Sequence, residues 1–472
     1  MTFSASTATC CGSATVRRGQ GSVSFKPVQP VRLQPRHRRR RRHHARRVTP
    51  PILRVVLIIA GALLVTLATC SAPLLPLKVR QASEAAPTPL PAAAIVSDPR
   101  MVATKAPQPS PTPLPSAIPI ATPIPTPTLM PGSAPGAPPL DPLGREIDAY
   151  LTGLTASGQF QGAVLVAQDG KVVIARGYGN ADENVPNTVY TRFRLASITK
   201  QFTAAAILAL QQDGKLTVDD AICVYLDNCP DAWKPLTIRH LLTHTSGLVD
   251  YTDFASFEPT EMHPATPQEL VERFRTFPLA FAPGMLYDYC NSNYVLLGLI
   301  IERVSGVAYA DYLHQRFFLP LGMTATGYDT SRGAIADGAQ GYVVPGKKSG
   351  FLDASTLYAA GGLYSTVGDL FRWDQALYTN EALARDQLDQ MFTPALRDYG
   401  FGWKIEVING RRRISHPGNM TGVATFFARY PDDRATIIVL ANMEYANVEG
   451  IANSIASRMF PPPPTPSPTR TR

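Results

Sequence analysis

Apolar positions along the chain predict strands at both ends of a globular region, with helices between them. Residues 162–167 and 171–177 flank Asp169-Gly170, a strong hairpin turn signal. The pattern from residue 214 to about 328 is mainly helical, and strands return in the last third of the chain. The later expected strands are 401–407, 411–415, 424–430 and 435–440, and helices are expected over 142–154, 201–212, 295–304 and 445–460.

Strands at both ends of one domain favour a single antiparallel sheet that is built from both termini. Helices would flank this sheet, and the mainly helical stretch would form an inserted lobe. The predicted class is therefore α/β (α+β), and the predicted domain spans residues 141–460.

The chain before this domain divides by composition into three segments. Residues 1–51 are polar and basic, with five consecutive arginines at 38–42, and predict a disordered arm. Residues 52–75 are largely apolar and reach the roughly 20 residues that a transmembrane helix needs. Arginines before such a segment keep that side in the cytoplasm. We expect an uncleaved anchor, with a cleaved export signal or a lipoprotein signal ending at Cys70 as alternatives; each places the domain outside the cytoplasm.

Proline-rich segments lie on either side of the predicted domain. Residues 76–140 are rich in Pro, Thr, Ala and Ser and contain too few large apolar residues for a core, so they predict an extended spacer. Residues 461–472 predict a second disordered tail.

Charge is unevenly distributed along the chain. Residues 1–54 contain 13 Lys or Arg and no Asp or Glu, so subtracting 13 from the net charge of +9 leaves −4 for the remainder. This balance argues against nucleic acid as a partner of the domain. Binding of nucleic acid by the basic arm is the weaker alternative and would be salt-dependent.

Six cysteines are present, and none forms a Cys/His cluster with zinc spacing, so we expect no metal. Cys223 and Cys229 flank a short segment and could close a disulfide loop or simply pack as thiols; the sequence leaves both open. Cys290 is expected to be a small space-filling residue rather than a nucleophile.

The most informative motif is Ser197-x-x-Lys200, placed where the 201–212 helix begins. Residues three apart share a helix face, so the Lys200 amine can lie against the Ser197 hydroxyl. A serine needs a neighbouring base to become a nucleophile, and burial disfavours the charged form of lysine. These residues predict a serine nucleophile with a lysine base.

Two further motifs carry side chains suited to the same chemistry. Tyr289 and Asn291 are two apart and can point to one side. Beside a lysine ammonium the anionic form of Tyr289 would be favoured, which makes it a candidate general base or acid. Asn291 offers a donor and an acceptor to a bound amide or ester.

The motif His416-Pro417-Gly418 follows the Asn409-Gly410 turn. His416 could donate a hydrogen bond to substrate or to the Tyr289 oxygen, and Gly418 would let substrate backbone approach. By contrast, His240 and His244 are four apart with no Glu between them, and we interpret them as structural.

From about residue 145 to 457 the chain resembles the serine β-lactamase-related hydrolases, which include class C β-lactamases, D-Ala-D-Ala carboxypeptidases, D-aminopeptidases and related esterases. The resemblance rests on several stretches in the family's order. They are Ser197-x-x-Lys200, the 239–247 stretch RHLLTHTSG, Tyr289-x-Asn291, the 320–323 stretch PLGM, the 361–366 stretch GGLYST with Asp369-Leu370, and His416-x-Gly418.

The resemblance implies a β-lactamase/transpeptidase-like fold and an acyl-enzyme mechanism without metal or organic cofactor. Ser197 would attack the substrate carbonyl while Lys200 and Tyr289 share its proton. The backbone N–H groups of Ser197 and Asn419 would hold the oxyanion, a pair of donors that commonly contributes about 3 kcal/mol. The remaining implied site residues are His416, as a further catalytic residue, and Asn291 and Gly418 for substrate binding.

Two motifs depart from the family pattern. His416-Pro417-Gly418 stands where class C β-lactamases and carboxypeptidases usually carry Lys-Thr-Gly, which weakens the case for a substrate carboxylate, and Cys290 stands where serine is frequent. We therefore expect an extracytoplasmic, membrane-tethered or secreted serine hydrolase acting on a small ester or amide, such as a D-amino-acid peptide or wall fragment. The alternatives are a true β-lactamase and a catalytically inactive binding or sensor domain of the same fold.

Overall fold

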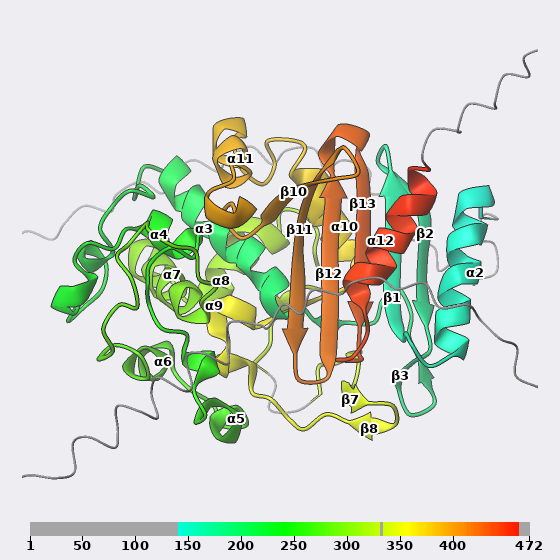
Figure 1. Cartoon of the computed structure of the whole chain (residues 1–472), viewed down its shortest axis with the longest axis horizontal. Helices are drawn as coiled ribbons and strands as arrows, with labels where there is room; N and C mark the ends of the chain where they lie inside the picture. The colour runs from blue at the N-terminus through cyan, green and yellow to red at the C-terminus, as the bar shows by residue number, and fades with distance from the viewer. Residues whose placement is uncertain (1–139, 331–333, 462–472) are drawn as a thin grey trace, which may run out of the picture. The chain divides into compact units, whose positions relative to one another are not determined.

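The computed structural model of the chain describes residues 140–330 and 334–461 (Figure 1). The predicted arm, apolar segment, spacer and tail lie outside the described residues, except for residues 140 and 461 at their borders. Within the described ranges, no helix combines the length and the apolar character needed to cross a membrane.

The central sheet has six antiparallel strands in the order β10-β11-β12-β13-β1-β2. N-terminal strand β1 pairs with C-terminal strand β13, so the two ends of the domain meet in the middle of the sheet, as predicted. The strands are β1 (Gly162–Gln168), β2 (Lys171–Tyr178), β10 (Lys404–Ile408), β11 (Arg411–Met420), β12 (Val423–Tyr430) and β13 (Ala435–Ala441), and shorter pairings involve β3 (Asn180–Asp182), β4 (Val185–Pro186), β5 (Phe193–Arg194), β6 (Gly327–Tyr328), β7 (Tyr342–Val344), β8 (Lys347–Lys348) and β9 (Leu363–Ser365).

Both faces of this sheet are covered, and the side chains of β13 alternate between them. Ile437 and Val439 join the core under α2 and α12, whereas Ile438 and Leu440 join the core on the opposite face. α12 lies across β12 and β13 and α2 packs on β2, with α10 behind the sheet (Figure 1). The longer helices are α2 (Pro142–Ala156), α3 (Thr199–Gln212), α7 (Asn291–Ser305), α10 (Val367–Ala376) and α12 (Val448–Met459).

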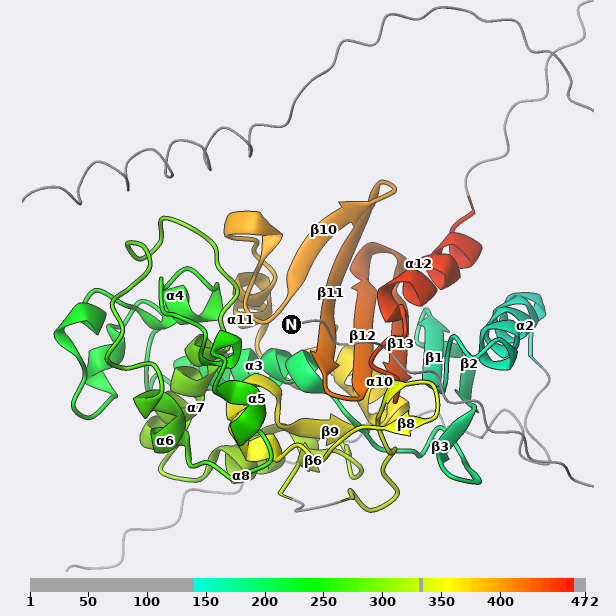
Figure 2. The same cartoon turned by 60° about the horizontal axis from the view of Figure 1, so that its bottom comes forward.

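The inserted lobe is helical, as predicted, and is organised around α3. Every residue of α3 from Thr199 to Leu210 is buried, because α7 and α9 pack on it from the lobe. Its N-terminal end lies beside β11 of the sheet (Figure 2). The shorter helices are α4 (Ile238–Leu242), α5 (Phe257–Thr260), α6 (Pro267–Glu272), α8 (Tyr309–Leu313), α9 (Tyr358–Gly361) and α11 (Arg385–Met391), with single turns η1 (Ala196–Ile198), η2 (Ile222–Val224), η3 (Asp231–Trp233), η4 (Tyr251–Asp253), η5 (His314–Phe318), η6 (Ala354–Thr356), η7 (Leu396–Asp398) and η8 (Pro431–Asp433).

Element boundaries near two motifs of the predicted site differ from those expected. α7 begins at Asn291 rather than at residue 295, so Asn291 is the first helical residue. β11 continues to Met420, which places His416 and Gly418 inside a strand rather than after one. The strand continues because residues 416–420 keep pairing with β12 up to the turn before Val423.

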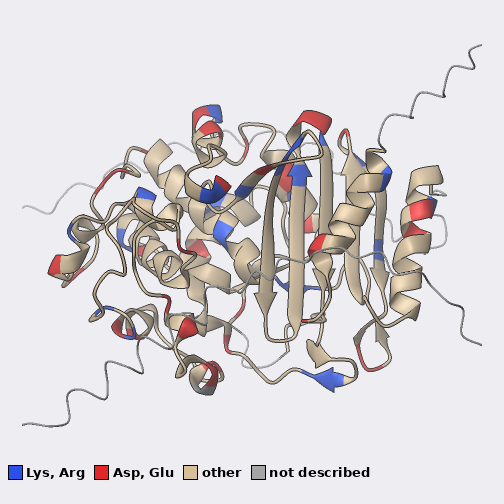
Figure 3. Ribbon diagram, viewed as in Figure 1, with Lys and Arg blue, Asp and Glu red and all other residues tan. Residues whose placement is uncertain are grey.

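Charged residues of both signs are interspersed over the elements of both lobes (Figure 3). This distribution agrees with the expectation that the basic balance of the chain belongs to its N-terminal arm.

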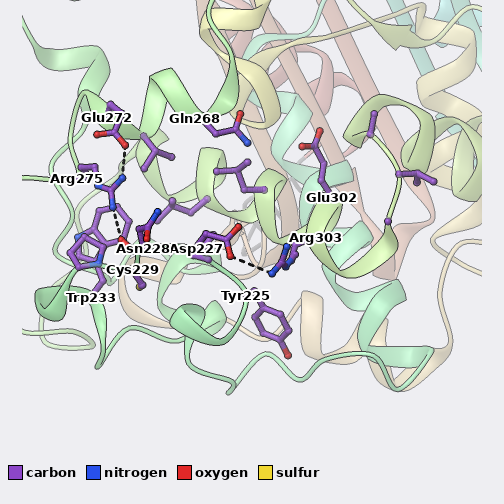
Figure 4. Close-up of a pocket in the computed structure, with 18 residues that line it drawn as sticks. Tyr225, Asp227, Asn228, Cys229, Trp233, Gln268, Glu272, Arg275, Glu302 and Arg303 are labelled. Atoms are coloured by element: carbon purple, nitrogen blue, oxygen red, sulfur yellow. Dashed lines mark hydrogen bonds and ion pairs between the residues drawn. The ribbon is translucent and has the colours of Figure 1, made fainter. Parts of the chain in front are cut away.

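Cys223 and Cys229 form a disulfide, with their Cα atoms 5.4 Å apart. The bond closes the loop between η2 and η3, at the edge of a cleft of about 700 Å³ that α6 and α7 also line (Figure 4). Both arginines labelled there are already engaged: Arg275 contacts Glu272 and the Asn228 carbonyl, and Arg303 contacts Asp227. None of the residues singled out as catalytic lines this cleft.

The disulfide predicts the alkylation pattern of the three cysteines in the described domain. In denaturant without reductant, an iodoacetamide label should appear on Cys290, the free thiol, and not on Cys223 or Cys229. After reduction all three should carry it, as read by peptide mass mapping. Label on Cys223 and Cys229 before reduction would show that the loop is open.

Candidate active site

Ser197 lies in the single turn η1, immediately before α3, and Lys200 lies in the first turn of α3. The preceding residue, Ala196, has a positive φ of 49°, so the chain turns sharply into the helix. This turn leaves Ser197 partly exposed, whereas the Lys200 side chain is completely buried. The sequence motif thus presents a reachable hydroxyl on top of a buried amine.

The Lys200 amine contacts three oxygens from three separate segments. Its Nζ lies 3.1 Å from Ser197 Oγ, 2.7 Å from Asn291 Oδ1 and 2.8 Å from the Ala360 carbonyl oxygen. Tyr289 donates a hydrogen bond from its hydroxyl to Ser197 Oγ at 2.9 Å. Four residues predicted from two distant parts of the chain, Ser197 with Lys200 and Tyr289 with Asn291, therefore meet in one network.

Burial makes Lys200 a suitable proton acceptor. Desolvation lowers the pKa of Lys200 from 10.5 to about 7, against a smaller opposing effect of the Asp250 carboxylate. A neutral amine has two hydrogens and one lone pair. The two hydrogens match Asn291 Oδ1 and the Ala360 carbonyl, which leaves the lone pair for the Ser197 hydroxyl proton.

The expected ionisation of Tyr289 is wrong. Burial is the largest influence on this phenol and raises its pKa above the usual 10.0, so Tyr289 is neutral at physiological pH. Lys200 does not offset this effect of burial, because its own pKa is lowered to about 7 and the amine is only partly charged at neutral pH. Tyr289 is thus a hydrogen-bond donor to Ser197 and can relay a proton, whereas Lys200 is the group able to accept one.

The hydrogen bonds of His416 within the protein differ from the expected contact with the Tyr289 oxygen. Its Nε2 lies 2.8 Å from the Tyr399 hydroxyl, and its Nδ1 lies 2.5 Å from the Pro417 carbonyl oxygen. Burial, with a contribution from Lys200, lowers the pKa of His416 to about 3. A neutral ring has one N–H, and the Pro417 carbonyl requires it on Nδ1, so Nε2 accepts from Tyr399. The His416 ring is therefore neutral, and its two nitrogens contact Tyr399 and Pro417 rather than the Tyr289 hydroxyl.

Tyr399 was not predicted from the sequence. Its ring also lies 4.8 Å from the His244 ring and 6.4 Å from the Tyr289 ring, measured between centroids. The one feature that could have drawn attention to it is its place in the aromatic and glycine-rich run 399–403. Its partners come from other elements, so sequence spacing does not reveal them.

Gly418 lets strand β11 approach the nucleophile turn. A Cβ at this position would lie 2.2 Å from Thr425 Oγ1, 2.3 Å from the Leu195 carbonyl oxygen and 3.2 Å from the Ser197 nitrogen. Only glycine leaves room for this approach. Asn419 follows on the same strand with an exposed side chain, and its role as an oxyanion donor stays a prediction.

The remaining residues singled out have structural contacts. His240 Nδ1 accepts a hydrogen bond from Thr237 N and so completes the cap of α4. His244 is buried, and its Nδ1 accepts from the Cys290 backbone N–H at 3.1 Å. Cys290 is itself buried, which raises its pKa to about 12 and keeps it a thiol. Among the described residues, no group of three or more His, Cys, Asp or Glu is arranged to hold a metal ion.

Fold and site together match those of a serine hydrolase, and the comparisons agree. The model of the Beta-lactamase family matches residues 147–458, so the chain belongs to this family of serine hydrolases. Penicillin-binding protein 4* of Bacillus subtilis (strain 168) is 35% identical over 316 residues, which cover 61% of this chain and 69% of that protein. A D-aminopeptidase of Brucella anthropi is 32% identical over 316 residues, covering 63% of this chain and 58% of the relative.

A solved structure gives the same result for the fold. The crystal structure of penicillin binding protein from Bacillus halodurans superposes with a TM-score of 0.60 at 30% identity, covering 65% of this chain and 98% of that one. The predicted β-lactamase/transpeptidase-like fold class is therefore confirmed.

The buried lysine predicts the pH dependence of Ser197 reactivity. Lys200 accepts a proton only when neutral, so the rate at which a fluorophosphonate probe labels Ser197 should rise with pH through a midpoint near 7. Tyr289→Phe should lower the rate without moving this midpoint, because the midpoint belongs to the amine. A midpoint near 10 in the wild-type protein would contradict the assignment of Lys200 as the base.

Proposed function

We propose that this protein hydrolyses a small ester or amide through an acyl-enzyme on Ser197, with a D-amino-acid peptide or amide as the favoured substrate class. The proposal rests mainly on one observation: the Ser197 hydroxyl lies 3.1 Å from the buried Lys200 amine and 2.9 Å from the Tyr289 hydroxyl. A nucleophile, a base of matched pKa and a proton relay are thereby within hydrogen-bond reach of one another.

In the proposed reaction, Ser197 Oγ attacks the substrate carbonyl carbon while its proton passes to Lys200. The backbone N–H groups of Ser197 and Asn419 stabilise the oxyanion. The proton then returns through Tyr289 to the leaving amine or alcohol as its bond to carbon breaks. Water attacks the acyl-enzyme by the same route, giving a carboxylic acid and free Ser197.

The neutral His416 favours peptidase or esterase activity over activity on penicillin-like substrates. A lysine at this position would offer a cation to a substrate carboxylate, whereas His416 is uncharged near pH 7 and its single N–H is held by the Pro417 carbonyl. The similarity to a D-aminopeptidase supports the same substrate class. A true β-lactamase is the alternative, supported by the similarity to penicillin-binding proteins.

We further propose that the domain works outside the cytoplasm. The Cys223–Cys229 disulfide supports this, because such bonds persist in oxidising compartments and are rare in the cytosol. The apolar stretch at residues 52–75 supplies a candidate export signal or anchor.

Steady-state turnover of four chromogenic substrates tests the proposed function. We expect the purified protein to hydrolyse p-nitrophenyl acetate and D-alanine p-nitroanilide, with L-alanine p-nitroanilide and a chromogenic cephalosporin turned over much more slowly. Ser197→Ala, the matched control, should lose about a thousandfold or more of each activity.

Rapid cephalosporin hydrolysis by the wild-type protein would instead favour the β-lactamase alternative. Turnover that survives in Ser197→Ala would remove Ser197 from the mechanism, and preference for the L-anilide would exclude the D-amino-acid assignment.

A further inference from the structure

The loop after α4 is bonded to the segment that carries Tyr289 and Asn291. His244 accepts from the Cys290 N–H, and its own carbonyl accepts from the Asp288 N–H at 2.9 Å. Farther along, the Ser292 hydroxyl donates to the Val249 carbonyl at 2.7 Å. The loop is therefore fixed to both sides of the Tyr289-x-Asn291 motif, and its one carboxylate between residues 244 and 252 is Asp250.

Asp250 contacts the Asn291 residue twice through one oxygen. Its Oδ2 accepts from the Asn291 backbone N–H at 2.7 Å and from the Asn291 side-chain Nδ2 at 3.1 Å. Its Oδ1 accepts from the backbone N–H of Thr252 at 2.9 Å and from the Thr252 hydroxyl at 2.8 Å. Four donors thus converge on one carboxylate, which acts only as an acceptor.

These contacts decide which end of the Asn291 amide faces Lys200. In the observed orientation, Oδ1 accepts from the Lys200 amine while Nδ2 donates to Asp250 and to Thr252 Oγ1. Rotating the amide by half a turn would set its NH₂ group against the lysine hydrogens and its oxygen against the carboxylate. Both contacts would become repulsive, so the carboxylate selects the acceptor end for the base.

We propose that Asp250 is a positioning residue, whose carboxylate holds the Asn291 amide with its oxygen toward Lys200 and places a fixed negative charge behind it. This inference rests on the proposed function, because it describes how the base of that reaction is held. Asp250 acts through Asn291 and touches no reacting atom, so it is not itself a catalytic residue.

Removal of the Asp250 charge should also change the titration of Lys200. Asp250 raises the pKa of the amine against the effect of burial, so its removal lowers that pKa. The other titratable groups that face or influence Lys200 are Cys290, His244, His416, Tyr289 and Tyr294. None of these other groups is a carboxylate, so Asp250 is the carboxylate among the groups named.

The test compares Asp250→Asn with Asp253→Asn in the full chain. The second variant removes the same charge three residues away, where the side chain is exposed and outside the network. The rate of Ser197 labelling by a fluorophosphonate probe is measured against pH, with a thermal melt for each variant. Asp250→Asn should label about a hundredfold more slowly, as expected for a misplaced catalytic group, with its midpoint lower by about one pH unit. Asp253→Asn should match the wild-type protein in both the labelling rate and its pH midpoint.

Thermal melts recorded over the same pH range show whether each variant stays folded, so a shift caused by pH-dependent unfolding is recognised as such. An unchanged rate in Asp250→Asn, or a slower rate with an unchanged midpoint, would overturn the inference. Failure of the proposed function would look different, because the wild-type protein itself would then leave Ser197 unlabelled.

Discussion

The site depends on a buried lysine amine, Lys200, whose hydrogens must be accepted by oxygens of the protein because water does not reach them. Lys200 has no solvent exposure, and α3 is buried through the whole of its first three turns. An isolated ammonium in such a place is strongly disfavoured, so the group gives up its proton more readily than in water. Asn291 Oδ1 and the Ala360 carbonyl satisfy the two hydrogens that remain. The lowered pKa of Lys200 therefore results mainly from its burial in the packed domain.

The second constraint is how closely the sheet and the helical lobe approach one another. Leu195 and Ser197 lie against β11 because Gly418 has no side chain. From the neighbouring strand β12, the Thr425 hydroxyl donates to the Leu195 carbonyl oxygen at 2.9 Å. The nucleophile turn is thus fixed by the C-terminal half of the sheet, while Tyr289 and Asn291 come from the lobe. Both halves of the domain must be folded before Ser197 has its partners, which couples activity to folding of the whole domain.

The sequence was sufficient for the fold class and for the residues that meet at Ser197. Strand periodicity and strong turns located both ends of the sheet, and Ser197-x-x-Lys200 carries its own geometry because residues three apart share a helix face. Charge states were less predictable. The sequence favours an anionic Tyr289 and a His416 that donates toward the site. The first property depends on burial and the second on Tyr399 and Pro417, neither of which spacing reveals. Tyr399 and Asp250 went unrecognised because their partners lie far away in the sequence.

The charge of Lys200 is the central claim, and it can be measured directly. The protein would be labelled with ¹³C at lysine Cε, and the Lys200 resonance assigned by its absence in Lys200→Arg. Its chemical shift would then be followed from pH 5 to 11. The structure predicts a titration midpoint near 7, well below the 10.5 of an exposed lysine. A midpoint at or above 10 would mean that the amine stays charged at neutral pH and cannot serve as the base for Ser197.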